Sequence, residues 1–450
     1  MMNNISSLKI GVVSLGCAKN LVDTEAILGV LSDKGAEIVA DPSNADCIIV
    51  NTCAFIDSAK EESINTVLEM AEYKKGKCRL LIMCGCLAER YAEDITAELP
   101  EVDAVCGTGD YLKIAEVIEE ALLGNKVKIY GNINAPIPES EKRIVTTGKT
   151  TAYIKIADGC DNKCTYCIIP KLRGKYRSRP IEAILDEARN LAENGIRELI
   201  VIAQDTTRYG FDLYGKYRLA ELLRELCKID KLRWVRVHYM YPEMITDDLI
   251  KVFREEEKLV KYMDIPIQHA SSAVLKRMGR KSTKEELYSL LLKLRKEIPS
   301  LSIRTSLIAG FPGETEEDFA ELFEFVKKMR FEHLGVFSYS QEEDTPAANL
   351  PDQIDENIKI MRRDKIMELQ SGISYEKNRE KIGKIFTVLC EGYDMDNLMY
   401  YGRSEYDSVD IDNLVYFASE DETEIGEFAE VEILDASEYD LTGRRIFGED

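Results

Sequence analysis

The feature that most constrains the fold is a repeated alternation of short apolar runs and amphipathic segments between about residues 145 and 380. The runs that we expect to be strands are Ala152–Ala157, Glu198–Ala203, Trp234–His238, Tyr262–Ile267, Ser302–Ile308 and Gly335–Tyr339. Strands that alternate with helices build parallel sheets, and six such units fall short of the eight in a closed barrel. The sequence therefore predicts a partial (β/α)6 barrel over residues 145–380.

The first 130 residues show the same alternation on a smaller scale. Apolar runs at Lys9–Leu15, Cys47–Val50 and Leu80–Met83 are separated by helical patterns near Leu21–Ser32 and Ser58–Tyr73. This order predicts a Rossmann-like, three-layer α/β domain over residues 1–130. The segment Gly131–Glu141 has no periodicity and contains Asn, Pro and Ser, which predicts a linker.

The last 70 residues differ in both pattern and charge. Period-two alternation at Phe386–Leu389, Leu414–Phe417 and Glu427–Leu434 predicts a small antiparallel β-barrel over residues 381–450. The chain carries 59 basic and 81 acidic residues, a net charge of −22. With 5 basic and 19 acidic residues, this final segment accounts for −14 of it. Such an acidic surface disfavours direct binding to nucleic acid and favours a basic protein partner.

The chain shows no sign of a membrane or secretory segment. No apolar run approaches the roughly 18 residues that a membrane helix needs. The start, MMNNISSLKIG, lacks the basic and apolar regions of a signal peptide. We therefore expect a soluble cytoplasmic protein with no membrane partner, in which the 12 cysteines are not a disulfide framework.

Three cysteines follow the first expected strand of the partial barrel. Cys160, Cys164 and Cys167 form a C-x-x-x-C-x-x-C motif in the polar loop DGCDNKCTYCIIP. Three thiolates on one loop can hold three irons of a 4Fe–4S cube, which leaves the fourth iron open for a ligand. A zinc site and three ordinary core thiols remain the alternatives from spacing alone.

A second cysteine triple occurs in the first domain. Cys17, Cys53 and Cys86 each stand just beyond an expected strand, in SLGCAKN, VNTCAF and CGCLAER. Because the carboxyl ends of parallel strands open on one edge of a sheet, we expect these side chains to converge. Three buried thiols in an α/β core are the alternative. Cys84 lies two residues before Cys86 and, within a strand, would face the same way.

The motif of the middle domain resembles that of the radical S-adenosylmethionine superfamily, including the aromatic Tyr166 before the last cysteine. The resemblance implies that the open iron chelates the amino and carboxylate groups of S-adenosylmethionine. Reductive cleavage then yields a 5′-deoxyadenosyl radical that abstracts hydrogen from an unactivated carbon.

The domain order resembles the methylthiotransferase family over essentially the whole chain, with a TRAM-type third domain. This resemblance implies that Cys17, Cys53 and Cys86 bind an auxiliary 4Fe–4S cluster, and that Cys84 does not. The strings SLGCAKN, AQDTTRYG, DIPIQHAS and GFPGETEEDF are similar to those of the ribosomal-protein (RimO-type) branch. That branch methylthiolates the β-carbon of an aspartate in ribosomal protein S-twelve.

The family also implies the partners of the reaction. We expect two 4Fe–4S clusters, S-adenosylmethionine as methyl donor and radical source, and an electron donor such as flavodoxin or ferredoxin. A tRNA adenosine methylthiotransferase is the alternative within the family, although its first cysteine string is SYGCQMN rather than SLGCAKN. A non-catalytic iron–sulfur sensor is the alternative from another class.

Further candidates come from the ends of the barrel strands, where such folds build their active sites. Gln204 and the turn at Gly310 resemble positions where radical enzymes hold S-adenosylmethionine. We therefore expect Gln204, Arg304, Gly310, Pro312 and Tyr166 to bind the cofactor, with structural polar groups as the alternative, and we assign no side chain as an acid or base. Lys171, Arg173, Lys175, Arg177 and Arg179 alternate along IPKLRGKYRSRP, a pattern that predicts an extended loop with its cations on one side. A solvated basic loop is the alternative for that stretch.

Overall fold

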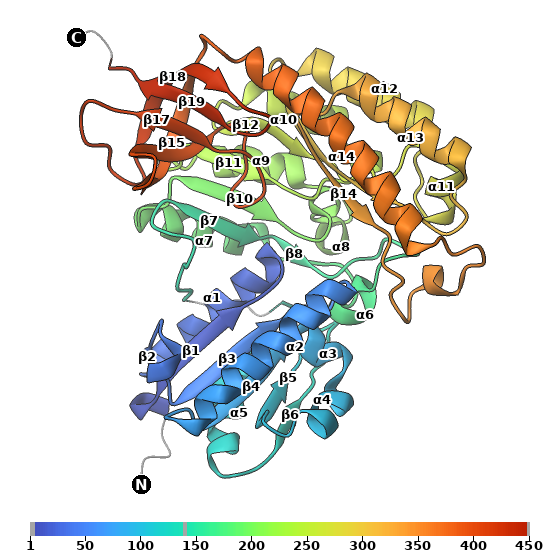
Figure 1. Ribbon diagram of the computed structural model, residues 1–450. Helices are drawn as coiled ribbons and strands as arrows, with labels where there is room; N and C mark the ends of the chain where they lie inside the picture. Colours follow the sequence, from blue (N-terminus) through green and yellow to red (C-terminus); the bar gives the residue numbers. More distant parts are fainter. Residues whose placement is uncertain (1–4, 138–141, 448–450) are drawn as a thin grey trace.

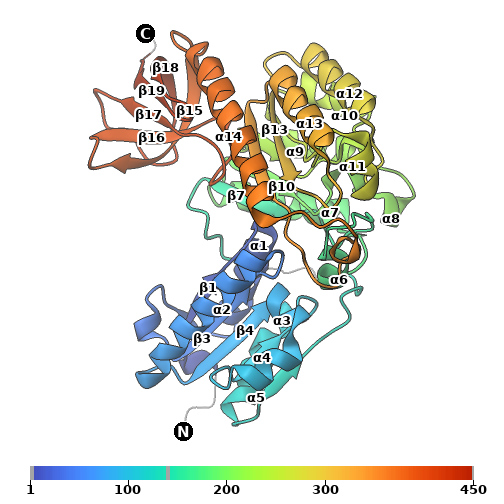
Figure 2. The same cartoon turned by 45° about the vertical axis from the view of Figure 1, so that its right-hand side comes forward.

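The computed structural model describes residues 5–137 and 142–447, which form three successive domains (Figures 1 and 2). The first four residues and part of the expected linker, residues 138–141, lie outside the described residues. None of the described helices combines the length and apolar character needed to span a bilayer.

The first domain is a parallel six-stranded sheet with the strand order β2-β1-β3-β4-β5-β6. Its strands are β1 Lys9–Ser14, β2 Glu37–Ile38, β3 Cys47–Thr52, β4 Leu80–Gly85, β5 Ala104–Cys106 and β6 Val127–Ile129. Its helices are α1 Ala18–Asp33, α2 Asp57–Ala71, α3 Cys86–Arg90, α4 Ala92–Glu98 and α5 Ile114–Leu122. β3 and β4 are buried along their whole length, as expected for parallel strands covered on both faces.

Two core clusters show how the helices cover this sheet. On one face, Ile10, Ile49 and Ile82 pack with residues of α1 and α5. On the other face, Ile48, Val50 and Met83 pack with residues of α2, α3 and α4. The three-layer architecture expected from the sequence is therefore confirmed.

The second domain is an open parallel sheet with the order β14-β13-β12-β11-β10-β7. Its strands are β7 Thr151–Lys155, β10 Glu198–Ile202, β11 Trp234–Val237, β12 Leu259–Asp264, β13 Ser302–Ala309 and β14 His333–Ser338. A short pair, β8 Ala157–Asp158 and β9 Arg177–Ser178, lies beside it. The six expected strands are all present, and the sheet does not close, so the partial barrel is confirmed.

Helices α7 Ile181–Glu193, α9 Leu219–Cys227, α10 Asp247–Glu255, α12 Lys284–Glu297 and α13 Glu316–Met329 cover the outer face of this sheet. Three shorter helices lie in its connections, namely α6 Ile169–Arg173, α8 Phe211–Tyr214 and α11 Ser272–Arg277, and α6 packs against α3 of the first domain. α14, Glu356–Arg379, packs against β14 and leads into the third domain (Figure 2).

The third domain is a closed five-stranded barrel with the order β15-β16-β17-β19-β18. Its strands are β15 Ile385–Asp394, β16 Met399–Ser404, β17 Val415–Ala418, β18 Phe428–Ala436 and β19 Leu441–Arg445. Two strands, β16 and β19, were not expected from the sequence. The barrel is mainly antiparallel, as expected, but β17 and β19 pair in parallel.

A loop of the third domain, residues 405–414, packs against the face of the second sheet that points away from its outer helices. His238 Nε2 lies 2.8 Å from Ser408 Oγ, and the Tyr262 hydroxyl donates to Asp412 over 2.6 Å. His333 Nε2 lies 2.9 Å from the carbonyl oxygen of Tyr406. Deleting the third domain would therefore leave buried polar groups of the second without partners, so the two are not independent units.

One buried carboxylate joins these two domains. Glu198, at the start of β10, accepts hydrogen bonds from Arg236 over 2.9 Å and from Arg403 of the third domain over 2.7 Å. Burial alone would raise the pKa of Glu198, but the two guanidinium groups outweigh it and lower the pKa to about 2. The pairing therefore stabilises the fold at neutral pH and is lost as the pH falls toward that value.

We predict that Glu198→Gln lowers the free energy of unfolding by about 3 kcal/mol, because it leaves buried guanidinium charges uncompensated. Glu432→Gln, which breaks an exposed pair with Arg444, is the control and should cost less than about 1 kcal/mol. Thermal unfolding at pH 7 measures both. Equal shifts for the two variants would contradict the anchoring role of Glu198.

Candidate functional sites at the domain junction

The cysteines of the first triple come from three neighbouring strand ends. Cys17 caps the amino-terminal end of α1, Cys53 follows β3, and Cys86 is the first residue of α3. Cys53 and Cys86 are buried, whereas Cys17 is exposed. Burial, together with the neighbouring Cys17 and Cys53 thiols, raises the pKa of Cys86 to about 12. The three cysteines therefore come from neighbouring strand ends on one edge of the sheet, as the strand-end argument expects, and Cys17 and Cys53 both influence Cys86.

Two glycines create the turns that bring these cysteines together. Gly16 and Gly85 adopt φ values of +86° and +90°, a backbone conformation that residues with a side chain rarely adopt. A Cβ at Gly16 would lie 2.7 Å from the Cβ of Cys53, and a Cβ at Gly85 would lie 2.2 Å from Asn51 Oδ1. Both positions therefore require glycine.

The turn at Gly85 also separates Cys84 from Cys86. Cys84 lies within β4 and packs in the core cluster formed with α1 and α5. Cys86 lies after the turn and packs in the cluster on the opposite face. The alternation that would point both side chains the same way ends at this glycine.

The surroundings of Cys17 are electropositive. Cys17 is exposed, yet the protein around its sulfur would by itself raise the pKa of Cys17; the charges of Lys19 and Arg173 outweigh that effect and lower the pKa. The Cys86 sulfur lies 3.7 Å from Asn20 Oδ1, which also accepts a hydrogen bond from Arg173. The thiolate of Cys17, the form that binds metal, is therefore easier to form than that of an ordinary cysteine.

The second triple lies on the loop between β8 and α6. Within it, the Cys167 amide donates to the Cys164 carbonyl over 3.2 Å, and the Asn162 amide donates to the Cys160 sulfur over 3.4 Å. Burial and the Cys164 thiol raise the pKa of Cys167. The Tyr241 hydroxyl lies 2.6 Å from the Cys164 sulfur. Among the described residues, no three His, Cys, Asp or Glu side chains are grouped closely enough to hold a single metal ion.

A buried ionic network joins the two triples, and sequence reasoning did not identify it. Arg173 Nη1 lies 2.6 Å from Asp23 and 3.1 Å from Asp158, and Lys155 pairs with the same two carboxylates. Asp23 lies on α1 after Cys17, and Asp158 precedes Cys160. Burial would raise the pKa of Asp158, but Lys155 and Arg173 hold it well below its usual range. The sequence offered one clue to this network, namely that Asp23 and Asp158 are charged residues close to the two cysteine motifs.

Gln204, a predicted cofactor-binding residue, lies beside this network. Its Nε2 donates to Asp158 Oδ1 over 2.8 Å, whereas its Oε1 is buried and has no hydrogen-bond partner among the described residues. The next residue, Asp205, accepts from Asn162 of the cysteine loop over 2.8 Å. Gln204 therefore presents a free acceptor next to the second triple.

Tyr166, Gly310 and Pro312 also gather near the second triple. Tyr166 packs edge-on against Phe311 at a centroid distance of 6.5 Å, and Gly310 and Pro312 flank that phenylalanine. Gly310 has a φ of +75°, and its amide donates to Glu314 over 2.8 Å.

Arg304 lies elsewhere. It is the third residue of β13, near the opposite end of the strand from Gly310, where it pairs with Asp264 over 3.1 Å and with Asp412 over 3.5 Å. The expectation that Arg304 stands at the carboxyl end is therefore wrong, because β13 continues for five residues beyond it.

The basic stretch is not an extended loop with its cations on one side. Residues Ile169–Arg173 form α6, and Arg177–Ser178 form β9. Arg173 is buried in the ionic network, whereas Lys171 is exposed and pairs with Asp344.

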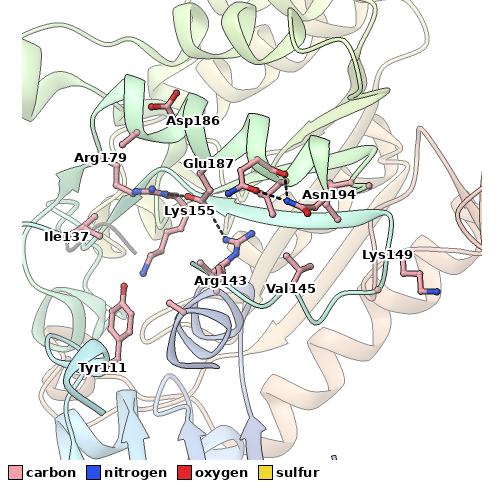
Figure 3. Close-up of a pocket in the computed structure, with 18 residues that line it drawn as sticks. Tyr111, Ile137, Arg143, Val145, Lys149, Lys155, Arg179, Asp186, Glu187 and Asn194 are labelled. Carbon is pink, nitrogen blue, oxygen red and sulfur yellow. Dashed lines mark hydrogen bonds and ion pairs between the residues drawn. The ribbon is translucent and has the colours of Figure 1, made fainter. Parts of the chain in front are cut away.

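A cavity of about 870 Å³ also lies between the first two domains, on the side of β7 that carries α7 (Figure 3). None of the six cysteines lines it. Glu187 there forms ion pairs with both Arg143 and Arg179, so these two arginines already have a partner.

Three stretches of the chain match known families. Residues 9–107 match the uncharacterized protein family UPF0004, residues 154–326 match the radical SAM superfamily, and residues 382–446 match the TRAM domain. The chain is 54% identical over 437 residues to the ribosomal protein uS12 methylthiotransferase RimO of Lachnoclostridium phytofermentans, covering 97% of this chain and 99% of that one. It is 52% identical to the protein of the same description from Clostridioides difficile, covering 98% and 99%.

Solved structures resemble the fold at low identity. One is the radical S-adenosylmethionine methyltransferase TsrM from Kitasatospora setae with cobalamin and a 4Fe–4S cluster bound, with a TM-score of 0.54. It is 13% identical, over 84% of this chain and 80% of that one. At this identity the likeness shows the fold alone.

Proposed function

Because the chain belongs to the RimO family of ribosomal protein uS12 methylthiotransferases, we propose that it attaches a methylthio group to the β-carbon of an aspartate in uS12. The observation that carries this proposal is the pair of cysteine triples, which come from different domains and are joined by one buried ionic network. A reaction that uses two clusters requires the two cluster sites to be held next to each other, and this network holds the two domains together at that place.

In this proposal Cys160, Cys164 and Cys167 hold the radical cluster, and Cys17, Cys53 and Cys86 hold the auxiliary cluster. When bound, the clusters and S-adenosylmethionine supply the sulfur, the methyl group and the carbon-centred radical. The donor sets suit this role, because each triple offers three thiols and leaves one iron of a cube open. The Gln204 Oε1 atom, which lacks a partner, is available to accept a hydrogen bond from the cofactor.

The surrounding side chains orient these groups. Once Cys164 binds iron as a thiolate, the Tyr241 hydroxyl can only donate to its sulfur, which fixes the ligand and stabilises its negative charge. Arg173 and Asp158 hold the cysteine loop against α1, so the two triples keep a constant separation.

The acidic third domain supports a basic protein substrate over tRNA, the alternative within the family. A flavodoxin or ferredoxin as electron donor and a cytoplasmic location, where ribosomal proteins are made, stay predictions.

Intact-mass measurement of uS12 tests the proposal. Anaerobically reconstituted enzyme, reductant, sulfide and S-adenosylmethionine should increase the mass of uS12 by one CH2S unit. A uS12 variant with the target aspartate replaced by Ala should not change. An unchanged mass of uS12 together with methylthiolated tRNA adenosine would instead support the alternative, and the absence of 5′-deoxyadenosine would support the sensor.

A further inference from the structure

Lys19 occupies a position that is unfavourable for a cation. It is the second residue of α1, where the unpaired amides of a 16-residue helix repel positive charge. Its side chain is buried, with only 8% of the residue exposed. Its ammonium lies 3.5 Å from the centroid of the Tyr239 ring, a cation–π contact.

Lys19 also differs from the other buried cations in having no carboxylate partner. No Asp or Glu among the described residues forms an ion pair with it. The other buried lysines and arginines of the described residues each lie within 4 Å of a carboxylate. Two share Asp23 and Asp158, namely Lys155 and Arg173. Two share Glu198, namely Arg236 and Arg403. The remaining ones are Arg179, Arg280, Lys359 and Arg362.

The negative group that influences Lys19 is the Cys17 thiol two residues away, together with the Tyr239 hydroxyl, and no carboxylate of the described residues reaches it. A buried ammonium without a carboxylate partner can accept one from a ligand. A carboxylate is therefore the partner that a substrate could bring to Lys19.

The location of Lys19 connects it to both triples. It lies two residues after Cys17, in the first turn of the same helix. Tyr239, under its ammonium, follows β11 and lies two residues before Tyr241, whose hydroxyl contacts Cys164. The amino-terminal end of α1 packs here against residues of β7 and β10 (Figures 1 and 2). An anion bound by Lys19 would lie between the two candidate cluster sites.

We propose that Lys19 binds the side-chain carboxylate of the target aspartate. The inference rests on the proposed function and names a substrate-positioning residue for it. The β-carbon is bonded directly to that carboxylate, so fixing the carboxylate fixes the C–H bond that reacts. S-adenosylmethionine also carries a carboxylate, but the superfamily resemblance assigns that group to the open iron.

The test compares uS12 with its Asp→Asn variant as substrates, since the amide has the same shape and no charge. Wild-type enzyme should prefer the aspartate form by about 100-fold in kcat/KM, the size expected for a buried charged contact. Lys19→Met should reduce this preference below about tenfold. Lys19→Arg, which keeps the charge, should keep a preference for aspartate.

Lys34→Met is the matched control, because Lys34 is exposed at the other end of the same helix. It should keep the wild-type preference.

Each contrary outcome has a distinct meaning. If wild-type enzyme modifies neither form of uS12, the proposed function itself fails. Suppose instead that the wild-type enzyme modifies the aspartate form. If Lys19→Met then keeps the full wild-type preference for aspartate over asparagine, the proposed role of Lys19 is wrong. Loss of S-adenosylmethionine binding in Lys19→Met, measured by equilibrium dialysis, would assign the ammonium to the cofactor and overturn the inference. So would a Lys19→Arg enzyme with no preference for aspartate.

Discussion

Cys86→Ala is expected to abolish methylthiolation of uS12 and to remove the auxiliary cluster, whereas Cys84→Ala should leave both intact. Cys86 comes from a strand end next to those of Cys17 and Cys53, and burial together with these two thiols raises its pKa. Cys84 is fully buried in β4 and packs in the core on the other side of the sheet. Its truncation should cost about 1 kcal/mol of stability and no activity.

The comparison is informative because both variants remove one cysteine sulfur atom, at positions that are only two residues apart. Iron content and intact mass of uS12 should both separate them. Activity retained in Cys86→Ala and lost in Cys84→Ala would reverse the assignment.

Replacing Cys160, Cys164 and Cys167 together by Ala should stop cleavage of S-adenosylmethionine. No 5′-deoxyadenosine should form above the rate without enzyme, because these residues are the proposed ligands of the cluster that delivers the electron. Chromatography of the reaction mixture measures the product. A matched variant with Cys227→Ala, a buried thiol remote from both triples in sequence and packed in the barrel core, should cleave normally.

Substantial 5′-deoxyadenosine from the triple variant would mean that the first-domain cysteines, or another site, support the radical step. Loss of cleavage in Cys227→Ala as well would point to general damage to the fold instead of loss of a ligand.

Much of the fold could be predicted because buried parallel strands are local signals. β3, β4 and β10 each contain a continuous apolar run of four residues or more, and all three strands are buried along their length. β16 and β19 escaped prediction because each contains a glycine where another strand's backbone approaches closely. A Cβ at Gly402 would lie 2.0 Å from the Leu389 carbonyl oxygen, and one at Gly443 would lie 2.4 Å from that of Glu432. Such strands lack a regular apolar alternation.

The site was predictable to the extent that it depends on strand ends. The placement of Cys17, Cys53 and Cys86 at neighbouring strand ends follows from the parallel sheet, but the separation of Cys84 from Cys86 depends on a single backbone angle at Gly85. The position of Arg304 depends on its distance from the end of its strand and on a partner, Asp412, that is more than 100 residues away. Local patterns contain neither kind of information.

The most direct test of the central claim, two separate clusters serving one reaction, is the iron content of the triple variant at Cys160, Cys164 and Cys167. Anaerobically reconstituted wild-type protein should hold about eight irons per chain, and the triple variant about four, bound by the first domain. Electron paramagnetic resonance of the reduced variant should show one remaining cluster. A variant that binds no iron would contradict the account, since it would mean that Cys17, Cys53 and Cys86 do not form a site of their own.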